Sequence, residues 1–322
     1  MNPQTSQRAL YDAASQGLRA LAADDRCRKA FTAPGSLLQH LLSPSARRYV
    51  VAADREEFLA CLAALRAKGY RSTVEFVGEE NSDRAQIERV VQEYLSLLAY
   101  EPAPEQVGFD LSNVGLAVSR DLALRNTARI VEAAADRGCE VILSMERFPT
   151  VDEVLGVYRE LAAEYDTVGI TLQAHLHRTE HDLAAVAQPG RKVRLVKGAF
   201  QEPPDVAVGR GPALDERYLR FAGELVERGV RLSLATQDPA VLAAAESSGL
   251  LARVTEIEML HGVQPQLLRR YQDAGHTCRI YATYGENWWL HLLHRLAEHP
   301  PMVLTALADL ADGTERVVGA DY

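Results

Sequence analysis

The sequence predicts a (β/α)8 barrel preceded by an N-terminal helical segment. From residue 72 onward, eight short runs rich in β-branched residues alternate with Ala-, Leu- and Arg-rich helical stretches, which is the pattern of parallel strands joined by crossover helices. No G-x-G-x-x-G motif follows any of these runs. Eight units without that motif favour a closed barrel over an open, doubly wound sheet.

The expected strands share a short length and a β-branched core. They are STVEFV (72–77), VGFDLS (107–112), EVILSM (140–145), VGITLQ (168–173), KVRLVK (192–197), VRLSLAT (230–236), RVTEIEML (253–260) and TCRIYA (277–282). Helices are expected over 87–100, 121–138, 151–165, 214–229 and 265–275. Three of them close with the glycine expected just past a helix end, at Gly138, Gly229 and Gly275.

Residues 1–70 are expected to form a helical segment packed on the barrel, and residues 71–322 the barrel itself. Helical runs occur around 5–30 and 54–68, separated by a Pro/Gly break at TAPGS. The predicted domain boundary therefore lies at residue 70.

Composition excludes several function classes. The 322 residues carry a formal net charge of -9, whereas nucleic-acid binding requires a basic surface. The four cysteines are scattered without a C-x-x-C pair, which argues against a zinc knuckle or a disulfide framework. The N-terminus has no apolar leader, and no segment approaches the roughly 20 apolar residues of a membrane span. We expect a cytoplasmic protein, with peripheral membrane contact left open.

Polar residues fall late in the expected strands, where a barrel places its catalytic side chains. They are Glu75, Asp110, Ser144, Glu146, Gln173, Lys197, Thr236, Gln237, Glu258 and Tyr281. Any one of these residues could equally cap a helix, satisfy a buried hydrogen-bonding group or take part in catalysis. The prediction of an active site at this end of the barrel therefore rests on all of them together.

Two of the strand ends suggest ligand classes. After Lys197, the small residues Gly198 and Ala199 let backbone amides approach an anionic group such as a phosphate or a reduced flavin. The H-x-H pair His175 and His177 suggests a metal. Gln237 and Tyr281 stand where further metal ligands would be needed, so we expect no metal.

These motifs together resemble the proline dehydrogenase family, FAD-dependent barrel enzymes that oxidise proline to pyrroline-5-carboxylate. The motifs STVEFVGE, QAHLHRTEHDL, RLVKGAF, LATQDP, MLHGV and RIYATYGENWW occur in the family's order and spacing. The resemblance runs from about residue 47 through HLLHRLAEHPP and covers most of the chain. It implies an FAD-dependent oxidoreductase.

The resemblance also implies which residues meet the flavin. Gln173 would meet the isoalloxazine edge and Arg178 would lie near flavin N5. Lys197, Gly198 and Ala199 would hold the ring and the ribityl phosphate, while Thr236 and Gln237 would contact the adenosine side, with glutamine in place of the family's histidine. Arg178 and Lys197 would stabilise the reduced flavin, and Tyr281 is retained from the family's active site.

The substrate side departs from the family. The family's last helix carries a tyrosine and two adjacent arginines that clamp the carboxylate of proline, whereas this chain has His291, His294 and Arg295. Asp110 replaces a carboxylate-binding lysine, and Ser144 replaces an aspartate. A proline carboxylate would therefore meet repulsion where relatives offer attraction.

These departures predict an FAD enzyme that oxidises a C–N or N–N bond of a small amine-type substrate, not proline, in biosynthesis. His291 or His294, titrating near neutrality, would set the protonation of the substrate nitrogen. The alternatives are an authentic proline dehydrogenase, a flavin-binding module without catalysis, and a pocket closed by an Asp110 to Arg295 pair. The electron acceptor (quinone or oxygen), the oligomeric state and a lid role for residues 201–215 stay open.

Overall fold

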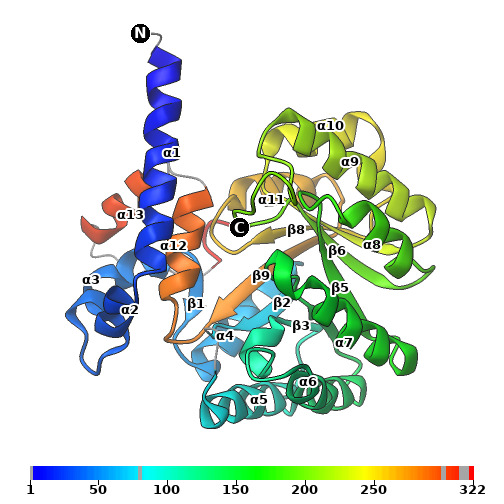
Figure 1. The fold of residues 1–322 in the computed structure, drawn as a ribbon, viewed down its shortest axis with the longest axis horizontal. Coiled ribbons are helices and arrows are strands. Elements are labelled where there is room, and N and C mark those ends of the chain that lie inside the picture. The colour runs from blue at the N-terminus through cyan, green and yellow to red at the C-terminus, as the bar shows by residue number, and fades with distance from the viewer. Residues whose placement is uncertain (1–2, 79–81, 299–301, 312–318) are drawn as a thin grey trace.

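The computed structural model describes residues 3–78, 82–298, 302–311 and 319–322. Eight parallel strands form a closed barrel, because β9 pairs with both β8 and β2 and every other strand pairs with its sequence neighbours (Figure 1). The strands are β2 (Arg71–Phe76), β3 (Gln106–Phe109), β4 (Glu140–Leu143), β5 (Val168–Gln173), β6 (Lys192–Val196), β7 (Arg231–Ala235), β8 (Glu256–Leu260) and β9 (Cys278–Tyr284). The predicted fold class is confirmed, and each expected strand overlaps one of these eight.

Helices cover the outside of the barrel between successive strands (Figure 1). They are α5 (Arg84–Leu98), α6 (Arg120–Ala135), α7 (Val151–Glu164), α8 (Thr179–Val186), α9 (Pro212–Glu227), α10 (Pro239–Ser247) and α11 (Pro265–Asp273), with short 3-10 helices at Leu111–Val114, Phe148–Thr150 and Leu250–Ala252. Local chemistry fixes their ends. For α6, the Ser119 side chain accepts a hydrogen bond from the Leu122 amide, and Gly138 takes a φ of 64° just after the helix.

The N-terminal segment forms α1 (Pro3–Ala22), α2 (Asp25–Thr32), α3 (Leu37–Ala46) and α4 (Arg55–Ala67), together with a ninth strand, β1 (Val50–Ala52). The sequence analysis missed β1. This strand has only three residues, and it gains its partners by pairing in parallel with Thr283 and Tyr284 of β9. It therefore depends on a tertiary contact that no local pattern reveals.

A second apolar cluster lies beside the barrel core, where α1, α2 and α3 meet α12 (Trp289–Glu298) and α13 (Met302–Ala311). Figure 1 shows these five helices gathered on one side of the barrel. Phe31 packs against Trp288 and Trp289, with ring centroids 4.6 and 5.4 Å away. The N-terminal helices thus hold α12, and the domain boundary at residue 70 remains a prediction.

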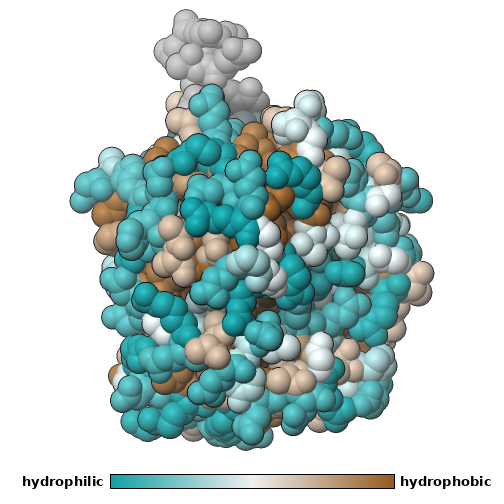
Figure 2. Space-filling model, turned by 90° about the vertical axis from the view of Figure 1, so that its right-hand side faces the viewer, coloured by the Kyte–Doolittle hydropathy of each residue, from teal (hydrophilic) through white to brown (hydrophobic). Residues whose placement is uncertain are grey.

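The helices on the opposite side of the barrel present a largely hydrophilic face (Figure 2), in keeping with the acidic composition. Within the described part of the chain, none of the helices has the length and apolar character needed to cross a bilayer.

Candidate functional site

A cavity of about 690 Å³ opens at the carboxyl ends of the barrel strands, and α12 forms one of its walls. Its volume lies in the range of small-molecule and cofactor sites. Twelve of the thirteen residues that the sequence assigned to the site line this cavity. They are Asp110, Ser144, Gln173, Lys197, Gly198, Ala199, Thr236, Gln237, Tyr281, His291, His294 and Arg295.

Arg178 is the exception, because it is not among the residues that line the cavity. Its guanidinium is bound by Asp182 at 2.7 Å and by Asp152 at 2.6 Å. These two carboxylates tie the start of α8 to α7 and raise the pKa of Arg178. The expected role of Arg178 beside the flavin stays a prediction; in the structure its contacts join two helices outside the cavity lining.

His175 and His177 do not converge on a common point. His175 Nδ1 lies 3.0 Å from the Lys197 carbonyl oxygen, and His177 Nε2 lies 3.1 Å from the Pro204 carbonyl oxygen. Among the described residues, no three His, Cys, Asp or Glu side chains are grouped as a metal would require. The two histidines instead fix the backbone around the end of β6.

One wall of the cavity is built for a close backbone approach. Gly198 has a φ of 115°, and a Cβ atom at this position would lie 1.7 Å from the His175 ring. Only glycine fits there. Nearby, Gln173 donates to the Glu146 carbonyl at 2.7 Å, while its buried Oε1 has no hydrogen-bond partner among the described residues. A buried amide oxygen that faces a cavity without a partner fits a ligand that donates a hydrogen bond.

Lys197 stands between two carboxylates at the rim. Its ammonium lies 2.5 Å from Asp215 and 2.6 Å from Asp238. Asp238 also caps α10 by accepting from the Ala240 amide. Its own burial raises the pKa of Asp238, but the hydrogen bond and the charge from Lys197 outweigh this and lower it. The positive charge of Lys197 is therefore largely offset by these two acids.

The floor of the cavity contains an ion pair that the sequence analysis missed. Arg194 of β6 donates to Glu258 of β8, and its guanidinium carbon lies 4.5 Å from the Tyr281 ring centroid. All three side chains line the cavity. Arg194 is thus a cation at the floor of the cavity that the sequence analysis did not name.

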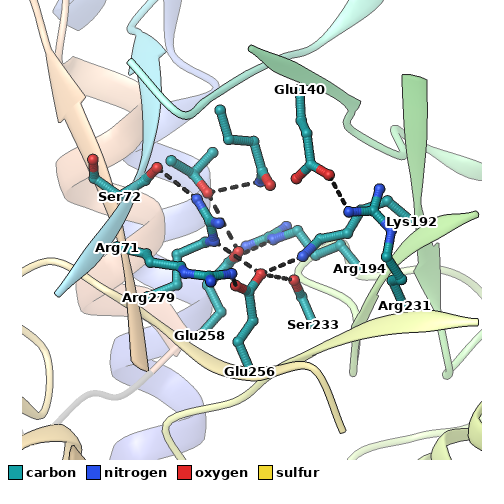
Figure 3. A network of polar contacts seen from close by, with 12 residues as sticks. Arg71, Ser72, Glu140, Lys192, Arg194, Arg231, Ser233, Glu256, Glu258 and Arg279 are labelled. Carbon is teal, nitrogen blue, oxygen red and sulfur yellow. Dashed lines mark hydrogen bonds and ion pairs between the residues drawn. The ribbon is translucent and has the colours of Figure 1, made fainter. Parts of the chain in front are cut away.

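Figure 3 shows that this pair continues into a polar network through the barrel interior. Glu256 accepts hydrogen bonds from Lys192, Ser233 and Arg279. Burial raises the pKa of Glu256, but the charges of Arg279 and Lys192 outweigh it and lower the pKa to about 2. These contacts join β6, β7, β8 and β9 in the barrel interior, while the other oxygen of Glu256, Oε2, is buried without a hydrogen-bond partner among the described residues.

Two further acids of the cavity, Glu75 and Asp110, lie close enough for the charge of Asp110 to affect the pKa of Glu75. Burial and, after it, the negative charge of Asp110 raise the pKa of Glu75, whereas the Tyr281 hydroxyl, Arg194 and Arg295 lower it; the net pKa is about 8. Both acids line the cavity. At neutral pH Glu75 therefore holds a proton, and the neighbouring charge of Asp110 disfavours the loss of that proton.

The wall formed by α12 differs from the expectation in two ways. Burial, followed by the charge of Arg295, lowers the pKa of His291 to about 3 and that of His294 to about 4. The expectation that these histidines titrate near neutrality is wrong, because the sequence does not reveal their burial. Both are neutral imidazoles at physiological pH.

Arg295 pairs with Glu298, one turn further along α12. Its two terminal nitrogens lie 3.0 and 3.2 Å from the Glu298 oxygens. The alternative in which Asp110 closes the pocket by pairing with Arg295 stays a prediction. The remaining Nε of Arg295 is buried without a hydrogen-bond partner in the described structure.

Further lining residues were not found from the sequence. Arg147 and Arg210 lie on the cavity wall, and Arg19 of α1 reaches toward it, donating to the Ala199 carbonyl at 3.3 Å. Residues 201–211 contact the end of β5, where the Val208 amide donates a hydrogen bond to the His175 carbonyl at 2.7 Å. The remaining part of the expected lid, 212–215, is the first turn of α9. A lid role stays a prediction.

Comparison with known proteins places this site in a family. The model of the family described as proline dehydrogenase matches residues 58–298, well over half of the chain. The chain belongs to the proline dehydrogenase family. Proline dehydrogenases are FAD-dependent oxidoreductases that act on a CH–NH group, so the family and the class of enzyme predicted from the sequence are confirmed.

Individual proline dehydrogenases are distant relatives. Proline dehydrogenase 1 of Bacillus subtilis (strain 168) is 25% identical over 262 residues, covering 79% of this chain and 87% of that protein. Proline dehydrogenase of Deinococcus radiodurans is 28% identical over 267 residues, covering 79% and 86%.

Solved structures of proline utilization A share the fold. The protein from Bdellovibrio bacteriovorus inactivated by N-propargylglycine matches with a TM-score of 0.71 at 19% identity, over 97% of this chain. The protein from Corynebacterium freiburgense matches with a TM-score of 0.69 at 18% identity, over 92%. This chain spans 40% and 34% of those two proteins.

Proposed function

We propose that this protein is an FAD-dependent dehydrogenase that removes hydride from a carbon next to nitrogen in a small amine-type substrate other than proline. The observation that carries the proposal is the cavity floor, where Asp110 and Glu75 stand together. By the family resemblance, Asp110 occupies the place of a lysine that contacts the substrate carboxylate. By the same resemblance, His294 stands at the first of the two clamp arginines, and the loss of that cation points in the same direction.

The cavity walls fit FAD. The partnerless Gln173 oxygen suits the N–H edge of an isoalloxazine ring, and the backbone at Gly198 allows close approach of a ring or a phosphate. Arg147 and Arg210 add positive charge on the cavity wall for a diphosphate. When bound, FAD would supply the two-electron acceptor for hydride.

The chain's own residues would orient the substrate over that acceptor. Tyr281 and Arg194 form the floor, and Glu258 holds the Arg194 guanidinium against the tyrosine ring. The Arg194 side chain is only 12% exposed, so its charge acts more strongly on neighbouring groups than it would in bulk water. Lys197 forms ion pairs with Asp215 and Asp238, which offset its charge. It would therefore help to position the cofactor more than it would stabilise the negative charge of the reduced flavin.

A carboxylate in this cavity would lack the support that proline requires. Opposite unit charges about 4 Å apart attract by roughly 1 to 4 kcal/mol between water and a partly buried site, and like charges repel by as much. With Asp110 in the place of a lysine, the substrate carboxylate meets repulsion instead of attraction at this position. His294 is neutral because of its lowered pKa, and Arg295 is held by Glu298. We therefore expect proline to be a poor substrate.

The second candidate is an authentic proline dehydrogenase with a rearranged clamp. Arg295 and Tyr281 are retained, and the curated relatives are proline dehydrogenases. In this reading the Arg295 to Glu298 pair would open and turn its guanidinium toward the substrate. The electron acceptor, quinone or oxygen, and a biosynthetic role belong to the proposal as well.

The test is a screen of small amines, amides, guanidines and hydrazines for bleaching of the protein's flavin absorbance without oxygen, with Asp110→Lys alongside. The proposal expects bleaching by at least one compound without a carboxylate, and Asp110→Lys should lower that rate while raising the rate with proline. Rapid turnover of millimolar proline with a dye acceptor would favour the second candidate. A protein that binds flavin that no amine reduces would be a flavin-binding module.

A further inference from the structure

We propose that Arg19 of α1 is a positioning residue of the cofactor site, which holds residues 198–200 in the conformation that receives the flavin. The inference rests on the proposed function, because the ligand of this site is the FAD proposed above. Arg19 lies outside residues 58–298, which the family model matches, so membership of the family assigns it no role. Three features lead to the inference: the contacts of the 198–200 segment, the charges around it, and the face of α1 that carries Arg19.

The 198–200 segment follows the end of β6 and belongs to no helix or strand. All three of its residues line the cavity, so the conformation of the segment shapes the wall. The Gly198 carbonyl accepts a hydrogen bond from Arg210 at 3.0 Å, and the Ala199 carbonyl accepts one from Arg19 at 3.3 Å. Arg210 belongs to the same connection between β6 and α9, whereas Arg19 comes from the first helix of the chain. Side chains, not a backbone ladder, therefore hold this segment in place, and one of them is supplied by α1.

Three guanidinium groups meet at this segment. Arg19 and Arg210 bind its carbonyl groups, and the guanidinium carbon of Arg147 lies 5.9 Å from the Phe200 ring centroid. None of the three arginines forms an ion pair with a carboxylate among the described residues. Burial contributes most to the lowered pKa of Arg19, and the neighbouring guanidiniums lower it further, against the charge of Glu298. The diphosphate of FAD carries the negative charge that would relieve the repulsion among these cations.

The packing of α1 on α12 brings Arg19 to this place (Figure 1). Residues three and four apart share one face of a helix, and the face that carries Arg19 also carries Ser15, Leu18 and Ala22. The Ser15 hydroxyl donates to the Ala297 carbonyl of α12 at 2.8 Å. Ala22 is buried in the apolar cluster of the N-terminal helices, and Leu18 packs against that cluster. Arg19 therefore stands between two anchored positions of α1, one turn from each.

The hydrogen bond from Arg19 to Ala199 couples the docking of α1 to the conformation of the cofactor wall. If the docked helix favours the conformation that binds FAD, then bound FAD favours the docked helix by the same free energy, because such coupling is reciprocal. Helix amides exchange with solvent when the helix opens or detaches. We therefore expect amide exchange in α1 to slow when FAD binds, although α1 is absent from the lining of the cavity.

The experiment measures FAD affinity and amide exchange in the full-length wild-type protein, Arg19→Ala and Ser15→Ala. The dissociation constant of FAD is obtained from the change in flavin fluorescence as flavin-free protein is added. Arg19→Ala should weaken FAD binding by about fivefold or more, the loss of one hydrogen bond from a charged donor. Ser15→Ala is the matched control, because it removes the hydrogen bond of α1 to Ala297 and leaves the contact with Ala199. It should change FAD affinity by less than about twofold.

Hydrogen exchange read by mass spectrometry on peptides from residues 9–22 tests the coupling directly. In the wild type, FAD should slow exchange there by about threefold or more, and Arg19→Ala should abolish the slowing. A contact that serves only to pack α1 would leave this exchange independent of FAD.

Exchange in α1 that FAD does not change in the wild type would overturn the inference, and this measurement needs no variant to fold. Equal weakening of FAD by Arg19→Ala and Ser15→Ala, or no weakening by Arg19→Ala, would overturn it as well. Failure of the role of Arg19 leaves FAD binding and flavin reduction by amines in the wild type intact. Failure of the proposed function appears separately, as a wild-type protein that binds no FAD or whose flavin no amine reduces.

Discussion

Glu258→Gln removes the charge that holds Arg194 at the cavity floor while keeping the size of the side chain. The Glu258 side chain is 0% exposed and that of Arg194 is 12% exposed. Removal of one partner from a buried ion pair costs about 3 to 5 kcal/mol, because the other charge stays buried without compensation. The glutamine oxygen still accepts a hydrogen bond and Arg194 touches the cavity, so we expect about 3 kcal/mol, the lower end of that range.

The assay is thermal unfolding of the flavin-free protein, which keeps cofactor binding out of the comparison. With about 2.1 cal/mol/K per residue over 322 residues, a loss of about 3 kcal/mol lowers the midpoint by about 4 °C. Glu160→Gln is the matched control. It makes the same change in the surface pair with Arg120, whose side chains are 52% and 35% exposed, and should shift the midpoint by less than about 1 °C. Equal shifts in the two variants would refute the reasoning.

Three further changes test other parts of the site. The pKa of Glu256 is lowered from 4.5 to about 2, so its carboxylate stabilises the folded protein above pH 4.5, and this contribution is lost as the pH falls toward 2. In Glu256→Gln, the free energy of unfolding measured with urea should therefore depend less on pH between 4.5 and 2. Gly198→Ala should lower the flavin content, measured by absorbance, at least tenfold, because the added Cβ would meet the His175 ring and φ is positive. Gly209→Ala, which has open space around it, should retain its flavin. An equal loss in both variants would contradict a flavin-binding role for the backbone at Gly198. Arg178→Ala should cost about 1 kcal/mol in urea unfolding and leave the flavin spectrum unchanged, and a shifted spectrum would return Arg178 to the site.

The barrel was predictable because its strands carry their own signal. Buried parallel strands read as short β-branched runs, and each such run in the sequence overlaps a strand of the barrel. The three residues of β1 have no such signal, since their strand conformation comes from pairing with β9. The contact of α12 with α1 likewise joins the two ends of the chain, where no local pattern indicates it.

The polar lining was predictable as a set, but individual roles depended on burial and partners. Arg178 follows the histidine-rich end of β5 and looked close to the site, yet Asp182 lies one turn away on α8 and binds it. The missed cation had a signal: along β6, Lys192, Arg194 and Val196 alternate onto one face, and the first two meet glutamates on β8.

The pKa values of His291 and His294 could not be anticipated in the same way. The adjacent Arg295 is visible in the sequence, but the burial that contributes most to each shift is a property of the folded wall. Neutral histidines strengthen the argument against a carboxylate clamp, because neither adds a positive charge at physiological pH.

L-Proline and pyrrolidine differ only by the carboxylate, so their rates of flavin reduction isolate the interaction on which the whole account depends. The measurement is stopped-flow reduction of the bound flavin without oxygen, at matched concentrations of the unprotonated amine. If Asp110 has inverted the charge of the clamp, pyrrolidine reduces the flavin with the larger second-order rate constant, and Asp110→Lys reverses the order. A wild-type protein that is reduced faster by proline than by pyrrolidine would contradict the account.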